Sequence, residues 1–123
     1  MRFLTANITA PDFAEKVRNE SGELDLVIHG AAVTASKMMV EQPVETIMTA
    51  IEGTRNVLEL AKAAGAQRFV YLSSMEMYGT LADESGRDIP ATEDRLGFLD
   101  LTKARECVRI CALALVMSMA FLS

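Results

Sequence analysis

Residues 24–29 and 68–72 predict two short strands with continuous apolar runs at 26–28 and 69–72, and a longer amphipathic stretch separates them. A strand without alternating polar residues is typical of a parallel sheet that is covered on both faces. Parallel neighbours need a crossover connection, and residues 43–64 have the three- and four-residue apolar spacing of a helix, with Val44 and Met48 on its stripe. The pattern therefore predicts an α/β fold around a parallel sheet.

The remainder of the chain extends the same plan. Residues 3–8 predict a further strand and residues 11–20 a helix, which gives a three-stranded parallel core. The polar residues 80–94 predict a surface loop, and residues 101–121 a last helix. A length of 123 residues suits one domain, here residues 1–123.

Small residues mark the places where segments approach closely. Gly53 lies inside the long predicted helix, where close packing against the sheet is the expected reason for a glycine. Gly30, which follows the first apolar stretch, lets other groups approach the backbone. Ser73 and Ser74 follow the second apolar stretch. Because ligands of parallel sheets bind beyond the carboxyl ends of the strands, the residues around Gly30 and these serines predict a binding site.

Composition excludes several classes of function. The formal net charge is −5 and no run of basic residues stands out, so we expect no nucleic-acid partner. The apolar residues 110–123 are too few for a membrane span, which needs about 20 residues, and the first residues carry no signal-peptide pattern. Cys107 and Cys111 are too few for a metal site, and we expect them to be buried thiols of a cytoplasmic protein.

Three segments together resemble the extended short-chain dehydrogenase/reductase family, which contains UDP-galactose 4-epimerase and the sugar-nucleotide dehydratases. The segments are residues 25–32, 53–61 and 68–79, in the family's order and at its spacing. The resemblance implies a partial Rossmann-like three-layer sandwich, NAD or NADP as cofactor, and a nucleotide-sugar substrate. We expect the resemblance to stop after Arg105. Our hypothesis is that the reading frame or the gene model changes near this residue.

The resemblance also implies a cofactor site. The loop that follows the first apolar stretch matches the family's loop along the ribose and pyrophosphate, and the end of the predicted N-terminal strand matches the adenine side. Asn7 stands where the family usually has an aspartate, and an amide still donates and accepts hydrogen bonds. The implied cofactor-binding residues are Asn7, Ile8, Ala31, Ala32, Val33, Thr34, Leu72 and Ser73.

Ser74, Glu76 and Lys103 are the implied catalytic residues. Ser74 matches the serine or threonine whose hydroxyl binds the sugar oxygen that is oxidised. Glu76 matches the glutamate of 4,6-dehydratases, but its usual acidic neighbour is Met75 here, which favours an epimerase or reductase. Lys103 is either the family's lysine beside a lost tyrosine, since Leu99 lies four residues before it, or an ordinary loop residue.

Two family motifs have no counterpart in these 123 residues. The sequence contains no G-x-x-G-x-x-G turn, which cradles the pyrophosphate, and no Tyr-x-x-x-Lys pair, which supplies the general acid/base. We therefore expect an incomplete family member that is inactive alone. The alternatives are a subunit that a partner chain completes, and a non-catalytic binding module. The missing first strand should leave an apolar face and a sheet edge open, which predicts a homodimer or self-association.

Overall fold

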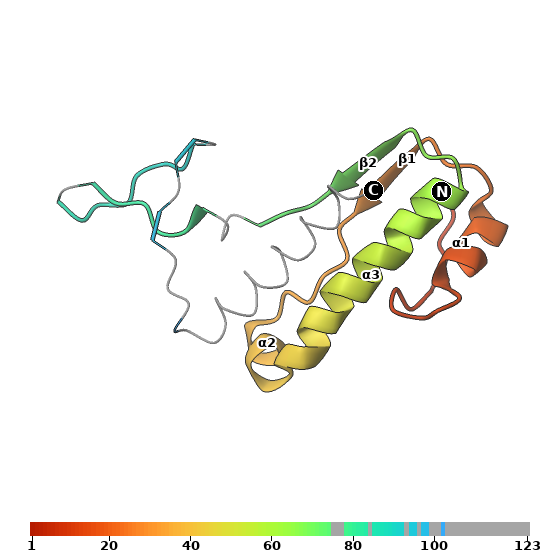
Figure 1. Ribbon diagram of the computed structural model, residues 1–123, viewed down its shortest axis with the longest axis horizontal. Helices are drawn as coiled ribbons and strands as arrows, with labels where there is room; N and C mark the ends of the chain where they lie inside the picture. The colour runs from red at the N-terminus through yellow and green to blue at the C-terminus, as the bar shows by residue number, and fades with distance from the viewer. Residues whose placement is uncertain (75–77, 84, 93, 96, 99–101, 103–123) are drawn as a thin grey trace.

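The computed structural model describes residues 1–74, 78–83, 85–92, 94–95, 97–98 and 102 (Figure 1). The elements in chain order are α1 (Phe13–Ser21), β1 (Leu26–His29), α2 (Ser36–Glu41), α3 (Pro43–Ala63) and β2 (Arg68–Tyr71). The helix α3 connects the two strands, which are parallel. The predicted α/β fold around a parallel sheet is confirmed, and α2 is an element that the sequence pattern did not predict.

The long helix begins and ends where the sequence predicts. Pro43 occupies the first turn of α3, where a missing N–H costs nothing. Gly65 follows the helix with a φ of 72°, a left-handed conformation that favours glycine. The Gly65 N–H donates to the Lys62 carbonyl (3.3 Å) and the Ala66 N–H to the Ala61 carbonyl (2.9 Å), which is a Schellman motif. This stop turns the chain directly into β2.

The sheet has a covered face and an open face. Leu26 pairs with Arg68 and His29 with Tyr71, so the strands are in register over their whole length. His29 is buried against α3, whereas Ile28, on the opposite face, is 61% exposed. Among the described residues, helices cover only the α3 face, and the apolar side chains of the other face are open to solvent, as expected for an incomplete sandwich.

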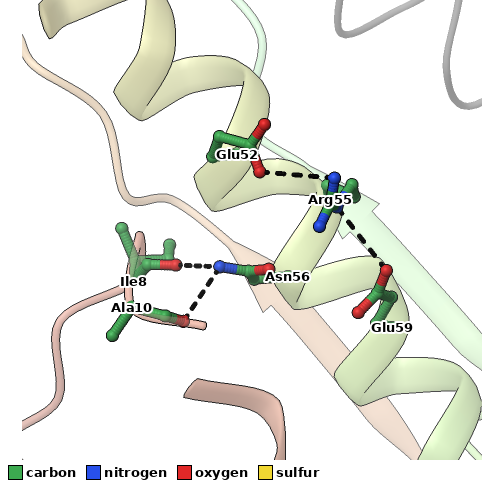
Figure 2. Close-up of polar contacts among 6 residues, drawn as sticks. All are labelled: Ile8, Ala10, Glu52, Arg55, Asn56 and Glu59. Atoms are coloured by element: carbon green, nitrogen blue, oxygen red, sulfur yellow. Dashed lines mark hydrogen bonds and ion pairs between the residues drawn. The ribbon is translucent and has the colours of Figure 1, made fainter. Parts of the chain in front are cut away.

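The predicted N-terminal strand is wrong. Residues 3–8 form no strand, and the sheet in the described part of the chain has two strands instead of three. A strand needs a neighbour for its backbone hydrogen bonds, and this segment lies against α3 instead. The Asn56 side chain donates from Nδ2 to the carbonyl oxygens of Ile8 (2.9 Å) and Ala10 (3.2 Å), as Figure 2 shows.

Gly53 serves the same contact. A Cβ atom at this position would lie 3.2 Å from Cγ2 of Ile8, so the glycine lets the N-terminal segment approach the helix. The close approach predicted from Gly53 therefore exists, but it is to Ile8 and not to the sheet.

The buried face of α3 differs from the predicted apolar stripe. Val44 is 72% exposed and Met48 is also exposed. The buried residues of the helix are Thr46, Gly53, Thr54, Asn56, Val57, Leu60 and Ala61. The buried polar side chains are satisfied by hydrogen bonds, which is the condition for burying them. A count of apolar residues at helical spacing does not detect such a face.

His29 is the polar centre of the core. Its Nε2 lies 2.9 Å from Oγ1 of Thr54. The centroid of its ring lies 5.3 Å from that of the Tyr71 ring, and the two ring planes are tilted by 58°. Thr54 is 2% exposed. Burial lowers the pKa of His29, because the charged imidazolium loses its hydration there.

The segment after β2 is a loop, as predicted. Two isolated antiparallel bridges, Thr80 with Phe98 and Ala82 with Asp88, hold it together. Gly97 has a structural reason, because a Cβ atom there would collide with the Thr80 carbonyl oxygen. The helix predicted for residues 101–121 lies outside the described residues. In the described part of the chain, no helix has the length and apolarity needed to cross a membrane.

The substitution Asn56→Ala should destabilise the protein. It removes the buried amide that donates to two part-buried backbone carbonyls, which costs about 1–3 kcal/mol. Arg55→Ala is the matched control, because Arg55 is the neighbouring residue of α3 and makes only exposed ion pairs with Glu52 and Glu59 (Figure 2). Such pairs contribute less than about 1 kcal/mol. Urea unfolding followed by circular dichroism measures both, and equal losses would contradict the assigned role of Asn56.

Stability should fall as the pH is lowered from 7.5 to 5.5. His29 is the only histidine of the chain. The pKa of His29 is lowered in the folded state, so the unfolded state binds the proton more tightly. As the pH falls toward and below about 6.5, the unfolded state therefore carries more bound proton than the folded state. The free energy of unfolding should therefore decrease by at most about 1.4 kcal/mol per pH unit in this range. In His29→Asn the decrease should disappear, and the same slope in both proteins would refute the assignment.

Candidate functional site

A pocket lies at the carboxyl ends of the two strands. The arrowheads of β1 and β2 point to the same side of the molecule in Figure 1. The segments that follow the two strands contribute to the lining of the pocket. Its volume is about 240 Å³. The loop after β1, the segment after β2 and the adjoining parts of α2 and α3 line this site pocket, with residues Gly30, Ala32, Val33, Thr34, Met39, Thr46, Ala50, Tyr71, Leu72, Ser73 and Ser74.

Gly30 lies in close contact with the side chain of Leu72 at the second strand end. A Cβ atom at this position would lie 3.1 Å from Cδ1 of Leu72, so a larger residue would require the Leu72 side chain to shift. The Leu72 N–H donates to the His29 carbonyl (3.0 Å), which continues the strand pairing for one more bond. The backbone of the site pocket is therefore set by the sheet itself.

Tyr71 contributes the largest polar side chain of the site pocket. Burial raises the pKa of its phenol, because the ionised form would lose hydration. The phenol is therefore neutral at physiological pH and acts as a hydrogen-bond donor or acceptor rather than as a base. Thr46, across the pocket on α3, is buried, and its hydroxyl donates to the Gln42 carbonyl (2.9 Å).

The structure brings most of the predicted site residues together. Six of them line the site pocket: Ala32, Val33, Thr34, Leu72, Ser73 and Ser74. Ile8 and Ala31 line a second, neighbouring groove beside β1. Asn7 is exposed, and its Oδ1 accepts hydrogen bonds from the N–H (3.1 Å) and hydroxyl (2.9 Å) of Thr9. Glu76 and Lys103 lie outside the described residues.

Sequence reasoning missed Met39, Thr46, Ala50 and Tyr71 as pocket residues. Thr46 and Ala50 lie four residues apart on one helical face, and Tyr71 shares a sheet face with Phe69, so their common orientation was readable. Which face meets the loop after β1 was not readable, because that depends on how α3 crosses the sheet.

The described residues contain no cluster of three or more His, Cys, Asp or Glu side chains arranged to hold a metal ion. Cys107 and Cys111 lie outside them. The side chains of the site pocket are hydroxyls, a thioether and small apolar groups. Such a lining suits hydrogen bonding to a polar organic group and contact with a flat ring.

Two curated relatives of this chain have different names, a decarboxylase and an epimerase. The chain is 35% identical over 80 residues to UDP-N-acetyl-alpha-D-glucosaminuronate decarboxylase of Bacillus cytotoxicus, covering 62% of this chain and 25% of the relative. It is 32% identical over 93 residues to UDP-glucose 4-epimerase of Haemophilus influenzae, covering 76% and 26%. The chain therefore spans about a quarter of the length of these relatives.

A solved structure shares the fold. RMD from Pseudomonas aeruginosa, solved in complex with NADPH, superposes with a TM-score of 0.71 at 24% identity. The match covers 97% of this chain and 39% of that protein. The Rossmann-like character of the fold is thereby confirmed.

The family itself is given by a match over nearly the whole sequence. The profile described as "NAD dependent epimerase/dehydratase family" matches residues 1–114. The expectation that the resemblance stops after Arg105 is therefore wrong, since the match extends to residue 114. The chain belongs to the NAD dependent epimerase/dehydratase family.

Proposed function

We propose that this chain provides the central part of an NAD(P)-binding unit of a nucleotide-sugar epimerase-type protein. The observation that carries the proposal is the site pocket, where two family segments meet at the carboxyl ends of paired parallel strands. Ligands of open α/β sheets bind at this edge. The RMD protein that shares the fold was solved with NADPH, and the family is described as NAD dependent.

The residues present fit one part of such a cofactor. Gly30 and Ala32 allow a ring or a ribose to approach the backbone, and the hydroxyls of Thr34 and Ser73 are available at the rim. At about 240 Å³, the site pocket is smaller than the roughly 300–1,000 Å³ of pockets that enclose a drug-sized ligand. A pyrophosphate-binding glycine turn would have to come from outside these 123 residues.

The proposed roles of the individual residues rest on the family resemblance. Ala31, Ala32, Val33 and Thr34 would orient the cofactor from the loop after β1, and Leu72 and Ser73 from the segment after β2. Asn7 and Ile8 would lie on its adenine side. Bound NAD(P) supplies a carrier that accepts or returns a hydride.

Ser74 would hold the substrate. Its position in the lining of the site pocket supports a role for its hydroxyl in binding the sugar oxygen at the carbon that gains or loses a hydride. Glu76 and Lys103 stay in the proposal as further catalytic positions by family resemblance. Because Met75 replaces an acidic residue of the dehydratases, an epimerase or reductase reaction on a nucleotide sugar is favoured over dehydration.

Catalysis by this chain alone is not part of the proposal. The sequence lacks a Tyr-x-x-x-Lys pair, and Tyr71 has Met75 four residues later. Its raised pKa makes Tyr71 a poor base. The chain is therefore proposed to be an inactive portion of a family member and to lie in the cytoplasm. Its alternatives are a subunit completed by a partner chain or by a second copy, and a binding module without catalysis.

NAD(H) binding to the purified chain tests the site assignment. We expect weak one-to-one binding with a Kd of about 1 mM, equivalent to roughly −4 kcal/mol, measured by calorimetry. Ala32→Phe should abolish binding, because the ring fills the site pocket. Ala63→Phe is the matched control, since Ala63 is also exposed but lies at the far end of α3. Absence of saturable heat, or equal binding by both variants, would contradict the assignment.

Catalysis is tested separately. The chain with UDP-glucose and NAD should give no UDP-galactose, because it lacks the tyrosine base. Turnover by the isolated chain would overturn the inactive-alone proposal. Turnover only after addition of a protein that carries G-x-x-G-x-x-G and Tyr-x-x-x-Lys would favour the partner-completed subunit.

A further inference from the structure

His29 joins the buried core of the protein to the site pocket. Its side chain is 4% exposed and bonds to α3. It is the last residue of β1, and its carbonyl oxygen accepts the N–H of Leu72 (3.0 Å), which lines the pocket. The next residue, Gly30, lines the pocket too. The site pocket therefore begins at a residue whose ring is held inside the core.

The ring of His29 also lies against a side chain of the pocket. Its centroid is 5.3 Å from that of the Tyr71 ring, with the two planes tilted by 58°. Tilted aromatic rings at such distances attract one another. Tyr71 is part of the pocket lining. A change in the position of the imidazole therefore reaches the pocket through Tyr71.

The hydrogen bond to α3 suits the neutral form of the ring. Nε2 of His29 lies 2.9 Å from Oγ1 of Thr54, which is 2% exposed. A neutral imidazole donates from one nitrogen and accepts at the other, so either of its tautomers can form this bond. An imidazolium donates from both nitrogens, and Thr54 can accept from one of them. The charged ring therefore has a donor that this bond does not satisfy.

The strands and the N-terminal segment offer the ring no countercharge in the described part of the chain. β1 has no other titratable residue. β2 contributes the neutral phenol of Tyr71, and its charged residue, Arg68, lies at the opposite end of the strand. The N-terminal segment and the start of α1 contribute apolar side chains to the groove that His29 lines.

The charged residues of α3 are engaged or exposed elsewhere. Glu52 and Glu59 pair with Arg55 (3.5 and 3.6 Å), and Glu45 and Lys62 are exposed in the first and last turns of the helix. A buried charge without a partner is costly, so proton uptake favours a position of the ring that reaches water.

We propose that the proton on His29 regulates the site pocket. While the ring is neutral, its bond to Thr54 holds it against Tyr71, and the pocket keeps the shape that binds its ligand. When the ring takes up a proton, it leaves this place, Tyr71 loses its neighbour, and ligand binding weakens. The identity of the ligand, NAD(H), rests on the proposed function, whereas the movement of the ring does not.

The affinity for NAD(H) should fall as the pH is lowered. Because the neutral form binds the ligand, binding releases the proton, and the affinity decreases by up to about tenfold per pH unit below the pKa of His29. Burial lowers this pKa, so the decrease lies below a pH of about 6.5. By the same linkage, NAD(H) at about ten times its Kd should lower the pKa of His29 by about one unit.

Proton NMR measures this pKa directly, because His29 is the only histidine of the chain. Its ring resonance is followed from pH 7.5 downward, with and without NAD(H). Saturable NAD(H) binding with an unchanged pKa of His29 would overturn the proposal. In His29→Asn, the affinity should be the same at pH 7.5 and 5.5. If circular dichroism shows that this variant is unfolded, the titration of the unmodified chain decides.

The movement of the ring is tested without any ligand. A nuclear Overhauser effect between the ring protons of His29 and Tyr71 should be present at pH 7.5 and lost about one unit below the measured pKa. The contact between the side chains of Ile28 and Val70, which are paired across the sheet, should persist and serves as the control. A ring contact that the protonated protein retains, or loss of both contacts together, would refute the switch.

The two kinds of failure can be told apart. Absence of NAD(H) binding at every pH would refute the proposed function, while the ring contact still decides whether His29 moves with its proton. NAD(H) binding of equal strength at pH 7.5 and 5.5 would refute this inference alone.

Discussion

The buried polar face of α3 is the constraint on which the rest of the structure depends. Thr54 bonds to His29 of β1, and Asn56 bonds to the carbonyls of Ile8 and Ala10. Each hydrogen bond contributes only about 1 kcal/mol net, but leaving a buried donor or acceptor without a partner costs more. These contacts therefore fix the position of α3 relative to both the sheet and the N-terminal segment, and misplacement of the helix is penalised twice.

The position of α3 in turn creates the site pocket. With its buried face on the sheet, the first turns of the helix place Thr46 and Ala50 beside the loop after β1. The Schellman motif at Gly65 then returns the chain to the start of β2, so that β2 runs parallel to β1 and ends beside it. Residues that are about 40 positions apart in sequence, such as Val33 and Ser73, line one pocket because parallel pairing brings strand ends to the same edge.

In the described part of the chain, the sheet has an open face and an unpaired outer edge. Strands of continuous apolar character are typical of sheets that are covered on both faces. Here one face of the sheet exposes Leu26, Ile28 and Val70. Solvent-exposed strand edges invite pairing with other chains. The same feature is the physical basis of the expected self-association.

The sequence by itself determined the α/β class, the bounds of the long helix to within a residue, the two parallel strands and most of the pocket residues. These follow from local chemistry: apolar runs, helical spacing, Pro43 and Gly65. The tertiary structure decided that residues 3–8 are no strand, that Val44 and Met48 are exposed, and that Tyr71 and Thr46 face the pocket. Strand formation depends on a neighbour, and the buried side of a helix depends on the hydrogen bonds available across the interface, so neither is written in the local pattern of residues.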